Sequence, residues 1–436
     1  MIIILVAILV LVVFFVLYTK YGIFSFAIVI TSIWWYGLDT MDRFILPRIS
    51  LSLLISVFAV MAILLFKPKL THGGRIVNKP IYLLRNLFVV LFLLGLFGLL
   101  LFSRDTYNGT YYLLNSTLLP FLIIWVLWVL INSDKELETI MKLFYFTTTL
   151  FAIIMLYNYS NNLFDQSSLI NTSLGNRLGG QPRFPFPFKV QYDPVALGVV
   201  LSNIFPLFLS YSLFKFKKKI SIIYFVPLVI ILITIFLTGT RSAWIAVTFS
   251  SIFLFGYGKI SKERFKLIFA FLILALITYN VFSNEINNTL FARVNSLENI
   301  QSTGNFLQRV YMFGLGLVVT YNNPLGIGFG RYNRIIINEH NFYTFISLGA
   351  GVLGLFLFLI IIYLIFHFIR KSQKENSGLR KNIAVGGIAV IIAFLINGFA
   401  SNSIAETFQS SGIFVAFGIT LSIYKLLKVK QNINKI

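Results

Sequence analysis

One histidine and a set of arginines are the side chains of this sequence best suited to chemistry at a membrane surface. His340 is one of three histidines, and it follows the glycine-rich stretch Asn-Pro-Leu-Gly-Ile-Gly-Phe-Gly, residues 323–330. An apolar run begins two residues later, at Phe342. An imidazole titrates near neutral pH and can act as a general base. The pattern favours a catalytic site at the surface of a bilayer. The alternative is a histidine that caps the following helix.

Arg241 stands in a very short polar connection between two apolar runs, within Leu-Thr-Gly-Thr-Arg-Ser-Ala-Trp, residues 237–244. Ionisable groups so close to hydrocarbon are costly and usually have a function. A short turn also leaves backbone N–H groups free at the start of the next helix, which favours an anion. We therefore interpret Arg241 as an anion-binding residue.

Two longer polar connections carry further arginines. Residues 158–193 contain Arg177 and Arg183 among three prolines and two adjacent glycines, which forbid a continuous helix and predict a shaped loop. At its end, Asp193 is expected to cap a helix that starts at Pro194. Residues 282–341 form the longest connection, which is typical of a functional loop. It carries Arg309 in an apolar stretch, 305–321, that we expect in or on the membrane surface.

Composition places these residues in a polytopic, all-α membrane protein. The 436 residues are 58% hydrophobic and 11% charged, with a mean hydropathy of +0.87. Uncharged runs long enough to cross about 30 Å of hydrocarbon recur along the chain. We expect a transmembrane bundle of about 12–14 helices in one domain, residues 1–436, with helices near 2–18, 21–37, 50–66, 86–103, 114–132, 143–157, 194–214, 220–237, 242–256, 265–281, 342–369, 382–400 and 407–424.

Charge sets the expected orientation. Lysine-rich connections alternate with lysine-poor ones, and the C-terminal tail is basic, which predicts cytoplasmic placement for the tail and for the connections near residues 67–85, 217–219, 259–266 and 370–381. The connections 38–49, 104–113, 158–193, 238–241, 282–341 and 401–406 then face outward. Thirteen crossings place the N-terminus outside, and twelve or fourteen are the alternatives. Because the net charge of +22 is spread over these connections, nucleic-acid binding is not expected.

The cations on the expected outer side are nearly all arginines: Arg43, Arg48, Arg104, Arg177, Arg183, Arg241, Arg293, Arg309, Arg331 and Arg334. Guanidinium binds phosphate oxygens through paired hydrogen bonds, so this set predicts a phosphate or carboxylate ligand. The alternative for about half of them is snorkelling to lipid head groups. With no cysteine and no histidine pair at metal-ligand spacing, we expect neither a metal ion nor a cofactor.

Several motifs, in order, resemble the O-antigen ligase and polymerase family. Thr-Gly-Thr-Arg-Ser-Ala, residues 238–243, resembles its T-G-S-R-G-A turn. Gln-Arg-Val-Tyr at 308–311, Asn-Pro-Leu-Gly-Ile-Gly-Phe-Gly at 323–330 and His-Asn-Phe-Tyr at 340–343 resemble its R-x-x-x-W, P-x-x-G-x-G and H-N-x-x-L series. Arg-Leu-Gly-Gly at 177–180 and Tyr-Asp-Pro-Val-Ala-Leu-Gly at 192–198 resemble its loop segment. The resemblance covers roughly residues 170–420.

The resemblance implies transfer of a glycan from a polyprenyl (undecaprenyl) diphosphate carrier to a glycan acceptor, without a metal ion. It places the active site at the outer face of the bacterial cytoplasmic membrane. His340 would correspond to the family's essential histidine. Arg241 and Arg309 would correspond to its diphosphate-binding arginines, joined by Arg177 and Arg183 from the shorter loop. The chain departs from the pattern at Val195 and Gly349, where many relatives have asparagine and glutamate.

The resemblance leaves the acceptor open. A polymerase adds one lipid-linked repeat unit to the growing chain, whereas a ligase moves the finished glycan to lipid A core or another acceptor. A composition rich in Ile, Asn, Lys and Phe is typical of an AT-rich genome and indicates a Gram-positive organism, which has no lipid A. This favours a polymerase, which would work with a flippase and a chain-length regulator. The alternative from another class is a lipid-linked oligosaccharide flippase. Flippases place charges within the bundle, whereas the charges of this sequence fall in its connections.

Overall fold

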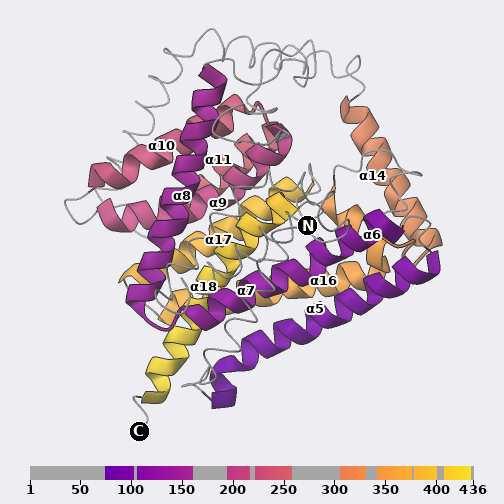
Figure 1. Ribbon diagram of the computed structural model, residues 1–436, viewed down its shortest axis with the longest axis horizontal. Helices are drawn as coiled ribbons and strands as arrows, with labels where there is room; N and C mark the ends of the chain where they lie inside the picture. The colour runs from indigo at the N-terminus through magenta and orange to yellow at the C-terminus, as the bar shows by residue number, and fades with distance from the viewer. Residues whose placement is uncertain are drawn as a thin grey trace, which may run out of the picture.

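The computed structural model describes residues 74–102, 106–160, 194–216, 221–257, 305–329, 341–375, 378–399 and 407–433, and every structural statement below refers to these. They form helices and no strand (Figure 1). The helices are α5 (Gly74–Phe102), α6 (Thr106–Leu113), the π-helical turn η2 (Leu114–Leu118), α7 (Leu119–Leu130), α8 (Asp134–Ser160), α9 (Pro194–Phe216), α10 (Ser221–Leu237), α11 (Arg241–Gly256), α14 (Asn305–Asn322), α16 (Phe342–Glu375), α17 (Gly378–Gly398) and α18 (Thr407–Ile433).

Seven stretches of helix in the described residues are long and apolar enough to cross a membrane, and α10 and α11 are shorter apolar helices. This confirms the predicted all-α, polytopic class. The predicted helices before residue 74 and at 265–281 lie outside the described residues. So do most of the connection 158–193 and much of the connection 282–341.

Several predicted boundaries are wrong, and the large errors all make the predicted helices too short. Helix α5 begins at Gly74 rather than 86, so part of the predicted basic connection 67–85 is helical. The predicted connection 104–113 contains helix α6. Helix α8 begins at Asp134 rather than 143, and α16 continues to Glu375 rather than 369. The predicted helices end where the apolar run meets charged residues. A helix can continue past that point, because its backbone hydrogen bonds do not depend on the surrounding hydrocarbon.

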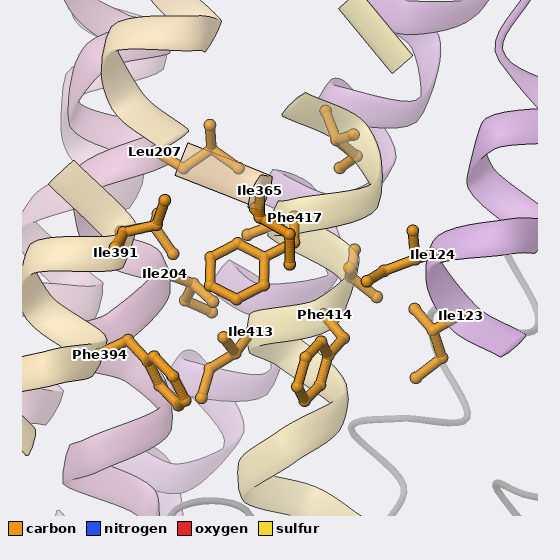
Figure 2. Close-up of a cluster of buried hydrophobic side chains, with 14 of the residues drawn as sticks. Ile123, Ile124, Ile204, Leu207, Ile365, Ile391, Phe394, Ile413, Phe414 and Phe417 are labelled. Carbon is orange, nitrogen blue, oxygen red and sulfur yellow. The ribbon is translucent and has the colours of Figure 1, made fainter. Parts of the chain in front are cut away.

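Helix α18 lies in the core of the bundle. It packs against α7, α9, α16 and α17, and the residues of its spanning stretch Gly412–Gln431 are mostly buried. Figure 2 shows Phe414 and Phe417 of α18 between side chains of α7 on one side and of α9 and α17 on the other. Gly418 allows α7 to come close, since a Cβ there would lie 2.5 Å from Leu127 Cδ1. Small residues at helix contacts are typical of membrane bundles.

Polar contacts join the basic helix ends at one end of the bundle. Arg380 Nε of α17 donates to Asp134 Oδ1 of α8 at 2.6 Å, and Lys215 Nζ of α9 lies 2.5 Å from Glu138 Oε1. The Lys425 ammonium of α18 donates to the Trp128 carbonyl oxygen at the end of α7. These contacts link the helix ends that the lysine-rich connections predict to be cytoplasmic.

At the other end, helix α16 is broken at Gly351, which has φ 76° and ψ −179°. In an unbroken helix the Val352 N–H would donate to the Leu348 carbonyl. Here the Ile327 N–H donates to Leu348 O at 2.7 Å, and the Val352 N–H donates to Pro324 O at 3.0 Å. The turn at residues 323–329 thus satisfies the backbone groups that the break leaves without helical partners, as a membrane interior requires.

Two glycines make this fit possible. Gly326 and Gly328 have φ values of 84° and 81°, in the region that favours glycine. A Cβ on Gly326 would lie 2.6 Å from the Gly351 nitrogen, and one on Gly328 would lie 2.5 Å from the Gly98 carbonyl oxygen of α5. The glycine-rich stretch therefore turns sharply, as predicted, and it does so in close contact with two helices.

Phe329 ends the turn in a socket lined by glycines. Its side chain is fully buried, and its ring centroid lies 5.3 Å from that of Phe345 in α16. A Cβ on Gly349 would lie 2.5 Å from Cδ1 and Cζ of this ring, and one on Gly95 would lie 2.7 Å from Cε2. Helices α5 and α16 thus leave room for one aromatic ring. The structure gives a physical reason for glycine at position 349, since a larger side chain would occupy the place of Phe329.

Gly349→Ala is therefore expected to lower the apparent Tm by a few degrees, because overpacking a filled site costs about 1–3 kcal/mol. The measurement is thermal unfolding of the purified protein followed by tryptophan fluorescence. Gly314→Ala in α14 is the matched control, since a Cβ there meets nothing within 4 Å and alanine favours a helix. Equal Tm values for the two variants would contradict the socket.

Candidate functional site

Three helices, α9, α11 and α16, begin at the end of the bundle where α17 finishes. A Cβ on Gly198 of α9 would lie 2.6 Å from Thr238 Oγ1 and 2.8 Å from Thr240 Oγ1, in the turn before α11. One turn further along α9, Ser202 Oγ accepts a hydrogen bond of 2.9 Å from Asn397 Nδ2 of α17. The Tyr343 hydroxyl of α16 donates to the carbonyl oxygen of Leu395 in α17 at 3.2 Å. Sequence charge assigns this end to the outer face.

Arg241 is the first residue of α11 at this end. Thr240 precedes it as the N-cap, with an extended backbone of φ −87° and ψ 106°, and accepts the first helical hydrogen bond from the Trp244 N–H at 3.2 Å. Thr238 and Thr240 are buried against α9, and Gly239 has φ 61°. The half-buried Arg241 therefore stands on a turn that packing holds in place, beside the positive end of the helix dipole.

The start of α16 is fixed by Asn341, which follows His340. Asn341 is buried, and its Oδ1 accepts hydrogen bonds from the backbone N–H groups of Tyr343 at 2.8 Å and Thr344 at 3.3 Å. The rings of Phe342 and Phe394 stack at 5.0 Å between centroids. Asn341 thus performs the capping that was the alternative role for His340. His340 itself lies in 330–340, outside the described residues, between the fixed Phe329 and Asn341.

The described helices carry two of the five predicted site residues, Arg241 and Arg309. Arg309 lies near the start of α14, a helix that packs on α16 and is linked to it by the contact of 3.0 Å between Thr320 Oγ1 and Ser347 Oγ. The apolar stretch predicted around 305–321 is thus helical. Helix α11 instead packs on α9 and α17, and Figure 1 draws α14 and α11 on different sides of α17. Arg177 and Arg183 lie outside the described residues.

A buried polar cluster beside the Arg241 turn was missed by the sequence reasoning. Ser202, Asn203 and Asn397 are fully buried, and Asn397 Nδ2 donates to Asn203 Oδ1 at 2.8 Å. Within the described part of the chain, Asn203 Nδ2 and Asn397 Oδ1 have no hydrogen-bond partner. Unsatisfied buried amides are costly. The signal was present in the sequence, because each asparagine interrupts an otherwise apolar run.

The described part of this end is suited to binding an anion. The positive dipole ends of three helices lie at this end of the bundle, and Arg241 adds a permanent charge with a planar set of donors. Among the residues that the structure describes, no three histidine, aspartate or glutamate side chains gather as metal ligands would.

A comparison with protein families agrees with this geometry. Residues 226–359 match the family model Wzy_C, described as O-Antigen ligase. The matched segment runs from α10 to the middle of α16 and includes the Arg241 turn, Arg309, the Phe329 socket and His340. No curated protein matches the chain. The match confirms the resemblance found in the motifs over residues 226–359 of this multi-pass membrane protein.

Proposed function

We propose that the protein is a cell-envelope polysaccharide polymerase. It would transfer a glycan from a polyprenyl diphosphate carrier to a sugar hydroxyl of another lipid-linked repeat unit, at the outer face of the cytoplasmic membrane. The observation that carries the proposal is the position of Arg241. It stands on a packed turn at the end of the bundle where α9, α11 and α16 begin, within the segment that matches the O-antigen ligase model.

The arginines are assigned to the leaving group. In the transfer, the acceptor oxygen bonds to the anomeric carbon of the donor sugar while the bond from that carbon to the diphosphate oxygen breaks. Negative charge develops on the lipid diphosphate, and fixed donors in a partly dry site stabilise it without rearranging. Arg241 supports this role by its rigid turn, and Arg309, Arg177 and Arg183 are proposed to complete the diphosphate site.

His340 is assigned to the acceptor. A sugar hydroxyl is a weak nucleophile, and a neutral imidazole near pH 7 can take its proton as the new bond forms. The proposal is supported by the chain on both sides of residues 330–340. Phe329 is seated in its socket and Asn341 caps α16, so the segment that carries His340 is held at both ends.

A ligase is the second candidate, because the matched family is described as O-Antigen ligase. The discriminating experiment uses purified protein in liposomes with a synthetic polyprenyl-diphosphate oligosaccharide and a chelator. A ladder of longer lipid-linked products supports the polymerase. Glycosylation of added lipid A core without a ladder supports the ligase. If neither product forms and the sugar lipid crosses the bilayer, the protein is a transporter and the proposal fails.

His340→Ala should lower the rate of glycan transfer about 10²–10⁴-fold, the usual contribution of a general base, while binding of the lipid-linked donor persists. The measurement combines product formation with donor binding to the same purified variant. His367→Ala is the matched control, because His367 is exposed on the part of α16 beyond the break at Gly351. Wild-type turnover by His340→Ala would remove the base assignment.

Arg241→Lys should lower transfer about 10²–10³-fold, as expected for a lost charge-stabilising donor, because an ammonium cannot reproduce the two parallel hydrogen bonds of a guanidinium. Arg85→Lys is the control, since Arg85 is exposed within α5, a different helix. Both variants should keep the wild-type Tm. Near-normal transfer by Arg241→Lys would show that Arg241 has a structural role only.

A further inference from the structure

An apolar cavity of about 650 Å³ lies between α11, α16 and α17. Helix α16 contributes one face to it, with positions Leu359 to Gln373 spaced at helical intervals. Fourteen residues of rise make this face roughly 21 Å long. The lining is aliphatic and aromatic, from Phe253, Tyr257, Leu359, Ile362, Tyr363, Phe366, Arg370, Gln373, Ile388, Ile391, Ile392 and Leu395.

The cavity has a polar end and an apolar end. Among the residues that the structure describes, Arg370 is the only charged one in the lining. Its guanidinium carbon lies 6.0 Å from the centroid of the Phe366 ring, which is also in the lining. Gln373, one turn further, places a mostly buried amide at the same end. A groove that is apolar along its length and cationic at one end matches a hydrocarbon chain with an anionic head group.

Arg370 belongs to the basic end of the bundle. It lies five residues before the end of α16 at Glu375, close to the start of α17 at Gly378, and the 21 residues of α17 then rise roughly 30 Å to the end of the bundle that holds Arg241. The neighbouring Phe368 contacts Tyr424 of α18, with 5.1 Å between ring centroids, and Lys425 of α18 belongs to the basic end described above. A head group at Arg370 is therefore separated from the Arg241 end by the thickness of the bundle.

We propose that this cavity binds an anionic phospholipid of the leaflet at the basic end, with its phosphate on Arg370 and one acyl chain along α16. One leaflet contributes about 15 Å of the roughly 30 Å hydrocarbon core, so an acyl chain fits within the length of the groove. Basic residues at a membrane surface favour anionic lipids. The inference is independent of the proposed glycan transfer, because it concerns a second lipid at the opposite end.

Native mass spectrometry of the full chain in detergent provides the test. The probes are phosphatidylglycerol, phosphatidylcholine with the same acyl chains, and a polyprenyl phosphate. The wild type should retain one phosphatidylglycerol in preference to phosphatidylcholine by about fivefold, the preference expected from one basic residue. Arg370→Gln should abolish this preference. Lys374→Gln, which removes an exposed charge outside the cavity one turn further along α16, should keep it.

A second variant tests the groove itself. Leu359→Trp fills the cavity from its partly exposed side and should prevent retention of the lipid, whereas Leu353→Trp, at an exposed position outside the lining, should not. Equal retention of the two phospholipids by the wild type, or wild-type preference in Arg370→Gln, would overturn the proposal. The proposal would also fail if a polyprenyl phosphate displaces phosphatidylglycerol, and if its binding survives Arg370→Gln but is lost in Leu359→Trp. The groove would then hold the carrier chain.

Discussion

The arrangement of the described helices depends on how the turn at residues 323–329 fits the break in α16. A helix broken inside a membrane exposes backbone groups that lipid cannot satisfy. Here the turn supplies both missing partners, through Ile327 N–H to Leu348 O and Pro324 O to Val352 N–H. The turn and the break depend on each other. The turn uses the Leu348 carbonyl that the break frees, and the break uses the Pro324 carbonyl of the turn as the acceptor for Val352 N–H. Glycines at 326, 328 and 351 bring the backbones close enough for this exchange.

From this contact the candidate site follows in steps. Phe329 fills the space between α5 and α16, and the part of α16 before Gly351 is held against α17 by Phe342 and Tyr343. Helix α17 in turn holds α9 through Asn397, and α9 holds the turn before Arg241 through Gly198. A continuous series of packed helices thus links the His340 segment to Arg241. Such linkage is what a site assembled from separate connections needs, because loops without support cannot hold charges to a fraction of an ångström.

The sequence predicted the class, the helix starts at Pro194 and Phe342, and the need for sharp turns at Gly326 and Gly328, because these depend on local hydropathy, proline and glycine. It did not predict the break at Gly351 or the socket at Phe329. The break depends on hydrogen bonds to a turn more than twenty positions earlier, such as Val352 N–H to Pro324 O, and the socket depends on Gly95, more than two hundred positions from Phe329. It placed helix starts too late at α5 and α8, where charged residues continue the helix beyond the apolar run. Arg241 was identified because its connection is so short. The pairing of Asn203 with Asn397 needed the tertiary structure.

The most direct test of this account is hydrogen–deuterium exchange, resolved to single amides, on the wild-type protein in lipid nanodiscs. The amides of Ile327 and Val352 lie outside an unbroken helical ladder but donate hydrogen bonds within the bundle. The account predicts that both exchange as slowly as amides within the buried turns of α16, because local opening would have to separate the turn from the helix. Exchange of Ile327 and Val352 at the rate of an exposed loop would show that the turn is not seated in the break, and would contradict the account.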